Sequence, residues 1–535
     1  MAATEPLLLP RAFIRCCRHT GAKSKIADSS GADLSGDETL IRSLILRRLL
    51  RKHVLVDDET NVGVLMPPTT GGFLVNMALA LDRRVVTNVN YTLSAETIDE
   101  CLKRAGIRQI LTSQRVIEKL KLDLKTPLVM LEDLRAKVTW RDKAAGYLAG
   151  KWWPVQWLER SLGLNHVARD DLITIIFTSG SEGVPKGVML SHYNIAADVW
   201  AAIEGIHLRE TDVLLGILPF FHSYGYTVTM WMVAAFGLKG VYHYSPLEPA
   251  QIGKLCEKHH ATILAATPTF LRSYIKRVEP ERFRSLDVVV AGAEKLRRDL
   301  ADAFEARFGV RPVEGYGATE LSPFVSVNVP PSRNKGATGP TLKEGTVGRP
   351  LTGFEARVID TATGKPLPTL SQGMLQIKGP IVMKGYLDEP EKTASVLRDG
   401  WYTTGDLAVI DEDGFIEIQG RESRFSKIGG EMVPHGLIEA RLSELVGGDD
   451  NGDLKLAVTA VPDVKKGERL VVVHTSLDQS PEALRRRLQE SGMPPLFLPA
   501  VDSFVQVESL PVLGSGKLDL KGIRRIALQR FGEDA

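Results

Sequence analysis

Short apolar runs alternate with amphipathic stretches from about residue 60 to about residue 320. Apolar runs bounded by turn residues predict buried strands, and amphipathic stretches predict helices. The predicted strands are 62–66, 84–89, 173–177, 213–217, 241–244 and 286–290. The predicted helices are a stretch ending at Leu81, then 96–103, 192–202, 249–258 and 295–307. Such alternation predicts an α/β fold of βα layers around parallel sheets, with ligands at the carboxyl ends of the strands.

Composition narrows the class of protein. The chain has 535 residues, which predicts roughly two to four packing units. Its 67 basic and 65 acidic residues give a net charge of +2, so no nucleic-acid partner is expected. Its four cysteines contain no C-x-x-C pair and are interpreted as reduced thiols of an intracellular protein. Neither a secretory signal nor a membrane span is recognisable, so the expected location is cytoplasmic, or peripheral at the inner face of the membrane.

The chain changes character twice. From about 345 to 420 the strands shorten and turns such as DTATG (360–364) and DEDG (411–414) become frequent, which indicates a small, β-barrel-like antiparallel part. Residues 421–535 mix strands (456–461, 470–474) with helices (437–445, 481–490). We therefore expect a large domain over 1–420 and a small, mobile α+β domain over 421–535, with a boundary near 421–425 and a cleft between the domains.

One segment has the residues of a phosphate-binding loop. A predicted strand leads into IIFTSGSEGVPKG (175–187). Glycines allow the backbone to approach an anion closely, while hydroxyls and an ammonium supply further donors. The segment is not a Walker A loop, because the G-x-x-x-x-G-K-[ST] spacing is missing. A surface turn is the alternative explanation. The candidate phosphate-binding residues are Thr178, Ser179, Gly180, Ser181, Gly183 and Lys186.

Two further segments combine glycines with a carboxylate. In GYGATE (315–320), Tyr316 could stack on a base and Glu320 could hold Mg²⁺, the alternative being a tight turn with a solvated carboxylate. In WYTTGD (401–406), Asp406 could accept hydrogen bonds from ribose hydroxyls, the alternative being a turn capped by this aspartate.

Two basic segments lie toward the C-terminus. GRESRFSKIGG (420–430) supplies Arg421 and Lys427, and a basic linker is the alternative. GSGKLDLKG (514–522) places Lys517 after a Gly-Ser-Gly loop, where it could move toward a ligand, although a solvated lysine is the ordinary explanation.

The five segments together, in this order and at these separations, resemble the adenylate-forming superfamily of acyl-CoA synthetases, luciferases and peptide-synthetase adenylation domains. The resemblance covers the chain from about residue 40 to the end. Secondary matches are PFFHSY (219–224), AGAEK (291–295), TVGRP (346–350) and VPDVKKGE (461–468). RFSKIGGEMVP and the stretch RRLLRKHVLVDDETNVGVLMPPTTGGFLVNMALAL look most similar to the acyl-acyl-carrier-protein synthetase part of bifunctional lysophospholipid acyltransferase/synthetase enzymes.

The resemblance implies a ligase that uses ATP and Mg²⁺. A carboxylate, here of a long-chain fatty acid, attacks the α-phosphate to form an acyl-adenylate, and a thiol then displaces AMP. The resemblance implies that the 178–186 loop binds phosphates, that Thr319 contacts the α-phosphate and that Glu320 binds Mg²⁺. It implies nucleotide binding by Asp406, Arg421 and Lys427, and adenine binding by Ala293, Glu294 and Tyr316. Lys517 would be catalytic, and His222 would border an acyl or thiol channel. The family commonly has an Asp-containing hinge shortly after the arginine of GR; Ser423 and Arg424 stand there, so no hinge residue is assigned.

The motifs do not identify the thiol acceptor or decide whether the protein binds a membrane surface. Acyl carrier protein is the expected acceptor, with coenzyme A as the alternative; a basic face of Arg485, Arg486, Arg487, Lys521, Arg524 and Arg525 would suit an acidic carrier. The stretches 40–52 and 143–158 could each lie on a membrane surface or pack on the large domain. His222 has a buried core histidine as its alternative.

Two other classes of protein are weighed. HVLVDD (53–58) has the H-x-x-x-x-D spacing of phospholipid acyltransferases, which we interpret as chance because no phosphate-binding motif lies near it. A catalytically inactive nucleotide-binding homologue is the third class, and the joint presence of Lys517, Glu320 and Asp406 argues against it.

Overall fold

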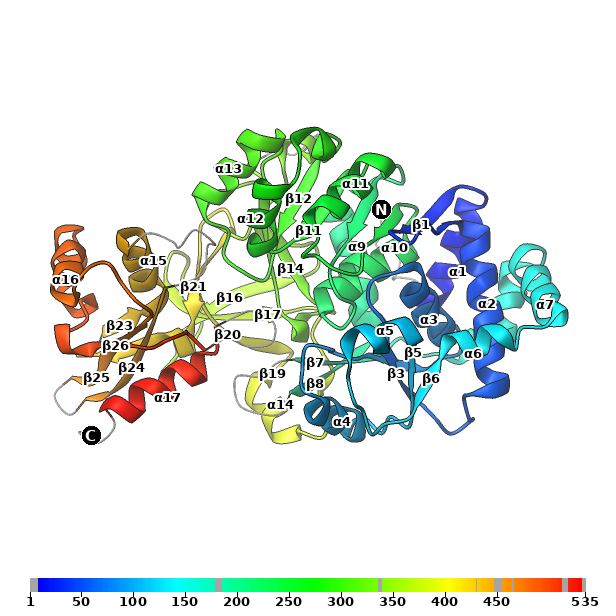
Figure 1. The fold of residues 1–535 in the computed structure, drawn as a ribbon, viewed down its shortest axis with the longest axis horizontal. Helices are drawn as coiled ribbons and strands as arrows, with labels where there is room; N and C mark the ends of the chain where they lie inside the picture. Colours follow the sequence, from blue (N-terminus) through cyan, green and yellow to red (C-terminus); the bar gives the residue numbers. More distant parts are fainter. Residues whose placement is uncertain are drawn as a thin grey trace. The chain divides into compact units, whose positions relative to one another are not determined.

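The computed structural model describes residues 8–178, 185–334, 339–429, 431–446, 455–463, 466–511 and 518–531 (Figure 1). The chain divides into two compact units. The first comprises Met1–Arg357, Gln376–Thr404 and Ile410–Glu417, and the second comprises Val358–Leu375, Gly405–Val409 and Ile418–Ala535. The second unit thus takes two short segments that precede the boundary near 421–425 expected from the sequence.

A nine-stranded sheet lies in the first unit, in the order β15-β14-β13-β12-β11-β9-β10-β1-β2. Strands β13 to β1 of this order are parallel, while the pairs β13–β14, β14–β15 and β1–β2 are antiparallel. Its strands are β1 Ser24–Asp28, β2 Asp33–Ser35, β9 Val213–Gly216, β10 Lys239–Tyr242, β11 Ile263–Ala266, β12 Val288–Ala291, β13 Val313–Gly317, β14 Phe324–Val327 and β15 Arg349–Pro350.

A seven-stranded sheet in the same unit has the order β18-β8-β7-β4-β3-β5-β6. Strands β7 to β6 of this order are parallel, and β8 and β18 add an antiparallel edge. Its strands are β3 Asn61–Leu65, β4 Val85–Asn88, β5 Ile110–Thr112, β6 Leu128–Met130, β7 Leu172–Thr178, β8 Lys186–Ser191 and β18 Gly385–Tyr386.

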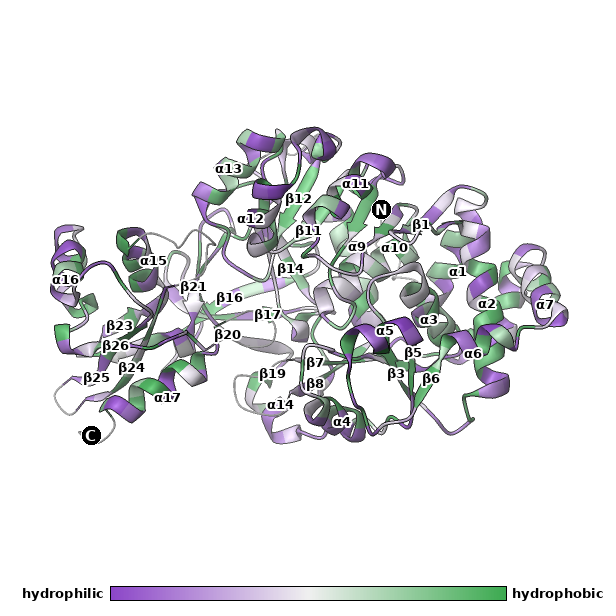
Figure 2. Ribbon diagram, in the orientation of Figure 1, coloured by the Kyte–Doolittle hydropathy of each residue, from purple (hydrophilic) through white to green (hydrophobic). Residues whose placement is uncertain are grey.

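The helices of the first unit cover these sheets. Strands β11 and β12, which are hydrophobic along their length, lie beside α11, α12 and α13 (Figures 1 and 2). Side chains of α3 pack on one face of the seven-stranded sheet and those of α4 on the other. The helices are α1 Leu9–Thr20, α2 Gly36–His53, α3 Thr70–Leu81, α4 Ala95–Arg104, α5 Gln114–Leu120, α6 Leu131–Ala136, α7 Trp140–Lys151, α8 Val155–Ser161, α9 His192–Gly205, α10 Met232–Ala235, α11 Pro249–His259, α12 Pro268–Arg277, α13 Arg298–Phe308 and α14 Pro390–Val396.

The β-rich part forms a five-stranded sheet of β16 Glu355–Ile359, β17 Gln372–Lys378, β19 Leu397–Arg398, β20 Trp401–Ile410 and β21 Ile416–Arg421. Two strands of the 345–420 segment, β15 and β18, belong instead to the two large sheets. The predicted turns at 360–364 and 411–414 are present, closed by backbone bonds from Gly364 to Asp360 (2.8 Å) and from Gly414 to Asp411 (3.0 Å).

The second unit contains a hairpin of β22 Phe425–Ile428 and β23 Glu431–Pro434, and a sheet of β24 Leu456–Asp463, β25 Gly467–His474 and β26 Phe504–Gln506. Its helices are α15 His435–Val446, α16 Pro481–Glu490 and α17 Leu520–Phe531. Alternate residues of β24 pack in opposite directions, as expected for a strand: Val458 contacts the cluster of Leu484 on α16, and Ala457 contacts the cluster of Ile523 on α17. Helices α16 and α17 therefore lie on opposite faces of this sheet.

The predicted α/β class is confirmed, with three local corrections. The 241–244 strand is β10, which begins at Lys239 and ends at Tyr242, and the 295–307 helix, α13, begins only at Arg298. WYTTGD is not a turn but the start of strand β20, with Gly405 at φ +76°. The sequence also did not indicate the antiparallel edge strands, because an apolar run has the same pattern in either direction.

Buried His192 begins α9 and has a perturbed pKa. Its side chain is 4% exposed, and its Nδ1 has no hydrogen-bond partner within the described part of the chain. Burial disfavours the charged imidazolium and lowers the pKa of His192 to about 4. The unfolded chain, with a pKa near 6.5, therefore takes up this proton first as the pH falls.

We predict that acid weakens the fold partly through His192. Its contribution is fully present above the unfolded pKa and is lost as the pH falls from about 6.5 toward 4. Between pH 7 and pH 5 the unmodified chain should lose about 2 kcal/mol more free energy of unfolding than His192→Gln. Denaturant unfolding at both pH values measures this difference. The exposed His53→Gln should match the unmodified chain, and parallel pH profiles for His192→Gln would contradict the prediction.

Candidate active site

A hairpin of the seven-stranded sheet brings two candidate phosphate-binding residues together. Strands β7 and β8 pair antiparallel, and Thr178 lies opposite Lys186 at their open end. The glycine-rich loop between them contains Ser179, Gly180, Ser181 and Gly183, which lie outside the described residues. The hairpin geometry fixes both ends of this loop at one place.

Lys186 lies next to a tyrosine that binds Glu320. The Lys186 ammonium is 5.0 Å from the centre of the Tyr386 ring, and the Tyr386 hydroxyl donates a 2.8 Å hydrogen bond to the Glu320 carboxylate. Burial, and then the Glu320 charge, raises the pKa of Tyr386 well above its ordinary value, so the phenol stays a donor. Burial likewise raises the pKa of Tyr402, which is hydrogen-bonded to Tyr386. Glu320 is therefore not the solvated carboxylate of a simple turn.

Thr319 is held by the segment that follows β9. Its hydroxyl is 3.1 Å from the hydroxyl of Ser223. The backbone N–H of Met383 donates to the carbonyl of Glu320 at 2.9 Å, and the Asn194 side chain of α9 donates to the carbonyls of Pro380 (2.7 Å) and Val382 (2.9 Å). Two segments distant in sequence thus contact the Thr319–Leu321 turn, and α9 fixes the second of them.

The glycines of GYGATE permit close backbone packing. A Cβ on Gly317 would lie 1.8 Å from the Pro323 carbonyl oxygen, and one on Gly315 would lie 2.7 Å from the Phe324 ring. Strand β14 can therefore fold back on β13, with Tyr316 opposite Ser326. Tyr316 itself is half-buried.

Ala293 and Glu294 follow the neighbouring parallel strand, β12. Ala293 has φ +67°, a strained conformation for a residue with a side chain. The Glu294 carboxylate accepts bonds from the backbone N–H (3.2 Å) and hydroxyl (2.7 Å) of Thr269, in the first turn of α12. Because β12 and β13 are adjacent and parallel, their carboxyl ends place these residues and Tyr316 at the same edge of the sheet.

His222 lies on the segment after β9, and its side chain is exposed, which excludes the buried core histidine. Its ring is 4.5 Å from that of Phe221, which in turn contacts Tyr91 at 4.7 Å. Close to it in sequence, Tyr224 stacks on Phe324 at 6.5 Å and borders an apolar cavity of ≈ 20 Å³. The cavity is lined by Ile206, Leu208, Leu214, Tyr224, Val228, Met232, Ile263, Ala265, Val288, Val290 and Phe324.

The second unit contains the remaining candidates. Arg421 Nε lies 3.0 Å from the Asp406 carboxylate, and the Asp406 side chain is only 6% exposed while that of Arg421 is 63% exposed. The backbone of Lys427 pairs with Met432 in the β22–β23 hairpin, but its side chain is not among those described. Lys517 lies outside the described residues.

The donor set suits a magnesium ion bound largely by a ligand. Among the described residues there is no group of three or more His, Cys, Asp or Glu that could hold a metal by themselves. Mg²⁺ usually takes one or two protein carboxylates and completes its octahedron with phosphates and water. A single carboxylate, Glu320, fits that pattern.

The structure does not support the phospholipid acyltransferase alternative, because the aspartate of its H-x-x-x-x-D spacing is paired with an arginine. His53 is exposed at the end of α2, and Asp58 forms a two-pronged ion pair with Arg108 at 3.0 and 3.1 Å. The H-x-x-x-x-D spacing therefore does not supply a His–Asp pair.

Sequence reasoning missed Tyr386, Tyr402 and the role of Ser223. A tyrosine in a Gly-Tyr dipeptide has no charge or spacing pattern that marks a site. Only pairing of β18 with β8, which sets Tyr386 opposite Val188, brings its ring to Lys186.

The chain was compared with known proteins. The family model described as "AMP-binding enzyme" matches residues 13–387. A long-chain-fatty-acid–CoA ligase of Bacillus subtilis is 32% identical over 56% of this chain and 51% of its own length. One of Thermus thermophilus is 34% identical over 66% of each, and a 4-coumarate–CoA ligase of Pinus taeda is 27% identical over 86% of this chain and 84% of its own. The chain thus spans about half of the first relative and 66% of the second.

Solved structures show the same fold. ATP-bound MatB of Rhodopseudomonas palustris matches 96% of this chain and 98% of its own, with a TM-score of 0.79 and 24% identity. MenE of Bacillus subtilis in complex with its acyl-adenylate intermediate matches 96% and 98%, with a TM-score of 0.79 and 20% identity. At these identities the similarity shows that the proteins share a fold.

The two mixed sheets of the first unit and the small α+β unit define an α/β protein of the fold seen in these structures. The family match over most of the first unit assigns it: the chain belongs to the AMP-binding enzyme family.

We predict that Gly317→Ala destabilises the first unit, because its methyl group would meet the Pro323 carbonyl oxygen. The overpacked backbone should cost about 1–3 kcal/mol of the free energy of unfolding, measured by denaturant titration. Gly339→Ala is the matched control, since nothing lies within 4 Å of its Cβ position. Equal stability of the two variants would contradict the proposed packing.

Proposed function

We propose that the protein activates a long-chain fatty acid with ATP, forming an acyl-adenylate, and transfers the acyl group to the thiol of coenzyme A. The observation that supports this most directly is the array of Lys186, Tyr386 and Glu320 beside the ends of the glycine-rich loop, in a chain of the AMP-binding family. The names of the relatives supply the substrate class.

The roles follow the charge of the reactants. A fatty carboxylate and a triphosphate are both anions, so positive charge and N–H donors must offset their repulsion. Thr178, Lys186 and the loop between them would bind the β- and γ-phosphates, Thr319 the α-phosphate, and Lys517 the attacking carboxylate and α-phosphate together. Glu320 would hold Mg²⁺, which supplies further positive charge to the phosphates when bound.

The remaining candidates would bind the nucleoside. Ala293, Glu294 and Tyr316 would line the adenine site from the ends of β12 and β13. Asp406 and Arg421 would contact the ribose, and Lys427 is a further nucleotide contact. The 3.0 Å Arg421–Asp406 pair supports a joint role, since it orients a carboxylate that is otherwise nearly buried.

The acyl chain would enter the apolar cavity behind Tyr224, with His222 bordering its channel. At ≈ 20 Å³ the cavity holds about one water-sized sphere, so side chains such as Tyr224 must move to admit a long chain.

Coenzyme A is favoured over acyl carrier protein as the acceptor. The relatives named above are CoA ligases. The basic residues expected to bind an acidic carrier also do not form one face. Arg485–Arg487 lie on α16, whereas Lys521, Arg524 and Arg525 lie on α17, and the two helices cover opposite faces of the sheet. Within α16, Arg487 is further engaged by Gln479 at 2.9 Å.

Fatty-acid-dependent ATP–pyrophosphate exchange tests adenylate formation. Lys517→Ala should lower this exchange at least about 10²-fold, because the charge that brings the two anions together is removed. Lys521→Ala, an exposed lysine on α17, is the matched control and should retain full exchange. Exchange that does not depend on the acid, or that survives Lys517→Ala, would contradict the proposal.

The acceptor is identified by mass spectrometry of the thioester formed from fatty acids of several lengths. Acyl-CoA is the expected product. A thioester formed with acyl carrier protein but not with coenzyme A would establish the carrier-protein alternative instead.

We predict that Tyr386→Phe raises the Mg²⁺ concentration that the exchange requires. Losing the 2.8 Å bond leaves the Glu320 carboxylate less well oriented, and loss of such a partner typically costs at least about tenfold in metal affinity or activity. Activity should be measured as a function of Mg²⁺ concentration. Tyr274→Phe loses a comparable 3.0 Å bond to the Pro246 carbonyl and should leave this dependence unchanged.

A further inference from the structure

Helices α7 and α8 and the turn between them expose large apolar side chains. The members are Trp140 (74% exposed), Tyr147 (49%), Leu148 (52%), Trp152 (69%), Trp153 (45%) and Trp157 (65%), here called the aromatic patch. It contains four of the seven tryptophans of the chain. Exposed large apolar side chains gathered on two successive helices are typical of an interaction surface.

Helix α7 buries one face and exposes another. With about 3.6 residues per turn, positions 142, 146 and 150 share one face, and positions 140, 147 and 151 share a second face about 120° around the helix axis. The first face packs on α2: a Cβ on Gly146 would lie 2.3 Å from Ile45, and one on Gly150 would lie 2.6 Å from Ile41. Close packing through glycines therefore holds the helix against α2, with Trp140 and Tyr147 exposed on another face.

The turn that bears Trp152 and Trp153 is also fixed. The Arg18 guanidinium of α1 donates to the carbonyls of Ala149 (3.1 Å) and Trp153 (2.9 Å), and to that of Lys151. These bonds satisfy carbonyls that the end of a helix leaves without partners. The patch is thus a rigid surface rather than a loose segment.

The acidic residues of α7 and α8 are buried and paired. Asp142 is bound by Arg48 at 2.7 Å, and Glu159 by Arg11 and Arg15, each at 2.9 Å. Both side chains are at most 5% exposed. Their charges are therefore neutralised inside the protein and do not reach the surface of the patch.

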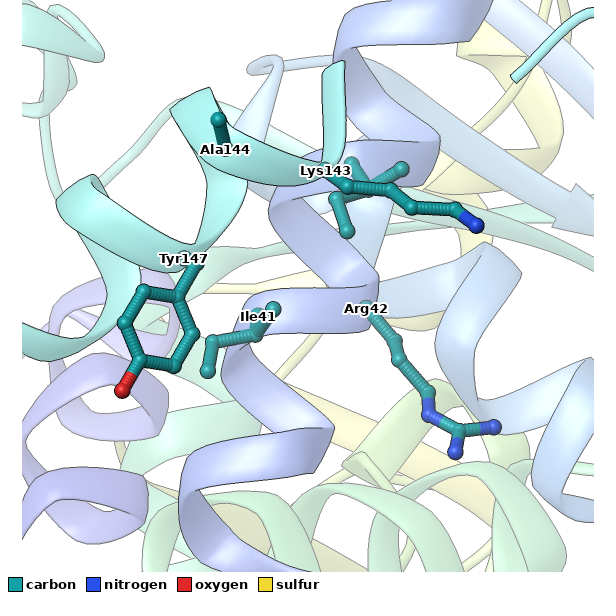
Figure 3. A pocket seen from close by; sticks show the side chains of 6 residues that line it. Ile41, Arg42, Lys143, Ala144 and Tyr147 are labelled. Atoms are coloured by element: carbon teal, nitrogen blue, oxygen red, sulfur yellow. The ribbon is translucent and has the colours of Figure 1, made fainter. Parts of the chain in front are cut away.

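The basic residues of the same helices remain outside. Arg141, Lys143 and Arg160 are exposed, and in the described part of the chain neither Lys143 nor Arg160 is paired with an acid. Arg42 of α2, which lies 3.9 Å from the Glu38 carboxylate, is also exposed. Together with Lys143 it lines an open depression of ≈ 610 Å³ between α2 and α7, whose other lining residues are Ile41, Ile45, Ala144 and Tyr147. Figure 3 shows the Arg42 and Lys143 side chains extending to the same side of this depression.

We propose that the aromatic patch, with its rim of Arg42, Arg141, Lys143 and Arg160, docks the protein onto the surface of an anionic lipid bilayer. Tryptophan and tyrosine rings combine an apolar body with a polar tip and settle at the boundary of headgroups and acyl chains, while arginine and lysine bind lipid phosphates. A second copy of the chain would bring the same positive charges face to face, which disfavours self-association through this surface. Among the described residues no helix is long and apolar enough to cross the bilayer.

Of the two basic apolar stretches, 143–158 supplies most of the exposed aromatic side chains, and 40–52 supplies Arg42 of the rim. The latter stretch forms most of α2, where Leu40, Leu44, Leu49 and Leu50 are buried. The docking proposal does not depend on the proposed enzymatic activity, because it concerns binding to lipid without substrate.

Co-sedimentation of the full chain with sucrose-loaded vesicles tests the proposal. Vesicles of phosphatidylglycerol and phosphatidylcholine in equal parts should bind the protein, and binding should weaken as salt rises. Replacing Trp152 and Trp157 together by serine should lower the partition coefficient at least about tenfold. Lys143→Glu with Arg160→Glu should lower it about tenfold or more on the anionic vesicles.

Matched surface changes outside the patch serve as controls. Leu247→Ser with Leu370→Ser alters leucines that are 68% and 61% exposed, and Lys258→Glu with Lys276→Glu alters exposed lysines of α11 and α12. Both pairs should bind vesicles like the unmodified chain, and all variants should keep its unfolding temperature.

Tryptophan fluorescence supplies a second measurement. Anionic vesicles that contain brominated phosphatidylcholine should quench the emission of the unmodified chain and quench that of Trp152→Ser/Trp157→Ser less. Protein that stays in the supernatant, patch variants that sediment like the unmodified chain, or a patch-dependent dimer without vesicle binding would each overturn the proposal.

Discussion

The hydrogen bond from Tyr386 to Glu320 joins the two large sheets of the first unit. Glu320 follows β13 of the nine-stranded sheet, while Tyr386 belongs to β18, the edge of the seven-stranded sheet. Lys186, one strand further in, lies over the same tyrosine ring. This contact therefore helps to hold the end of the β7–β8 hairpin and the Glu320 carboxylate close together, as the proposed phosphate site requires.

Neighbouring hydrogen bonds hold the segments around the Tyr386–Glu320 contact in place. Asn194 fixes the segment that carries Met383, whose N–H binds the Glu320 carbonyl, and Ser223 fixes Thr319. Burial keeps the Tyr386 phenol protonated, so it remains a donor over the whole physiological range. The aromatic patch on α7 and α8 belongs to a different region of the same unit, held by α1 and α2.

Much of the fold could be predicted from the sequence because its signals are local. Apolar runs predicted β3, β4, β7 and β12 to within about two residues; amphipathic periodicity predicted α4 and α11 equally well and placed the end of α9 three residues early. The antiparallel edges could not be predicted, because pairing direction depends on which distant strand lies alongside. The division of the basic residues between α16 and α17 was missed for a related reason, since only the packing of β24 decides which face each helix covers.

By itself the sequence determined the alternating α/β pattern, the near-neutral charge and the motif segments, two of which (175–187 and 315–320) lie inside the family match, because these depend on residue type and short spacing. The tertiary structure alone decided that Tyr386 binds Glu320, that His222 is exposed, and that Asp142 and Glu159 are buried while the neighbouring tryptophans are not. These hydrogen bonds and exposures share one physical reason. Exposure and hydrogen bonding are set by segments far apart in the chain, and no local pattern records which of those segments will meet.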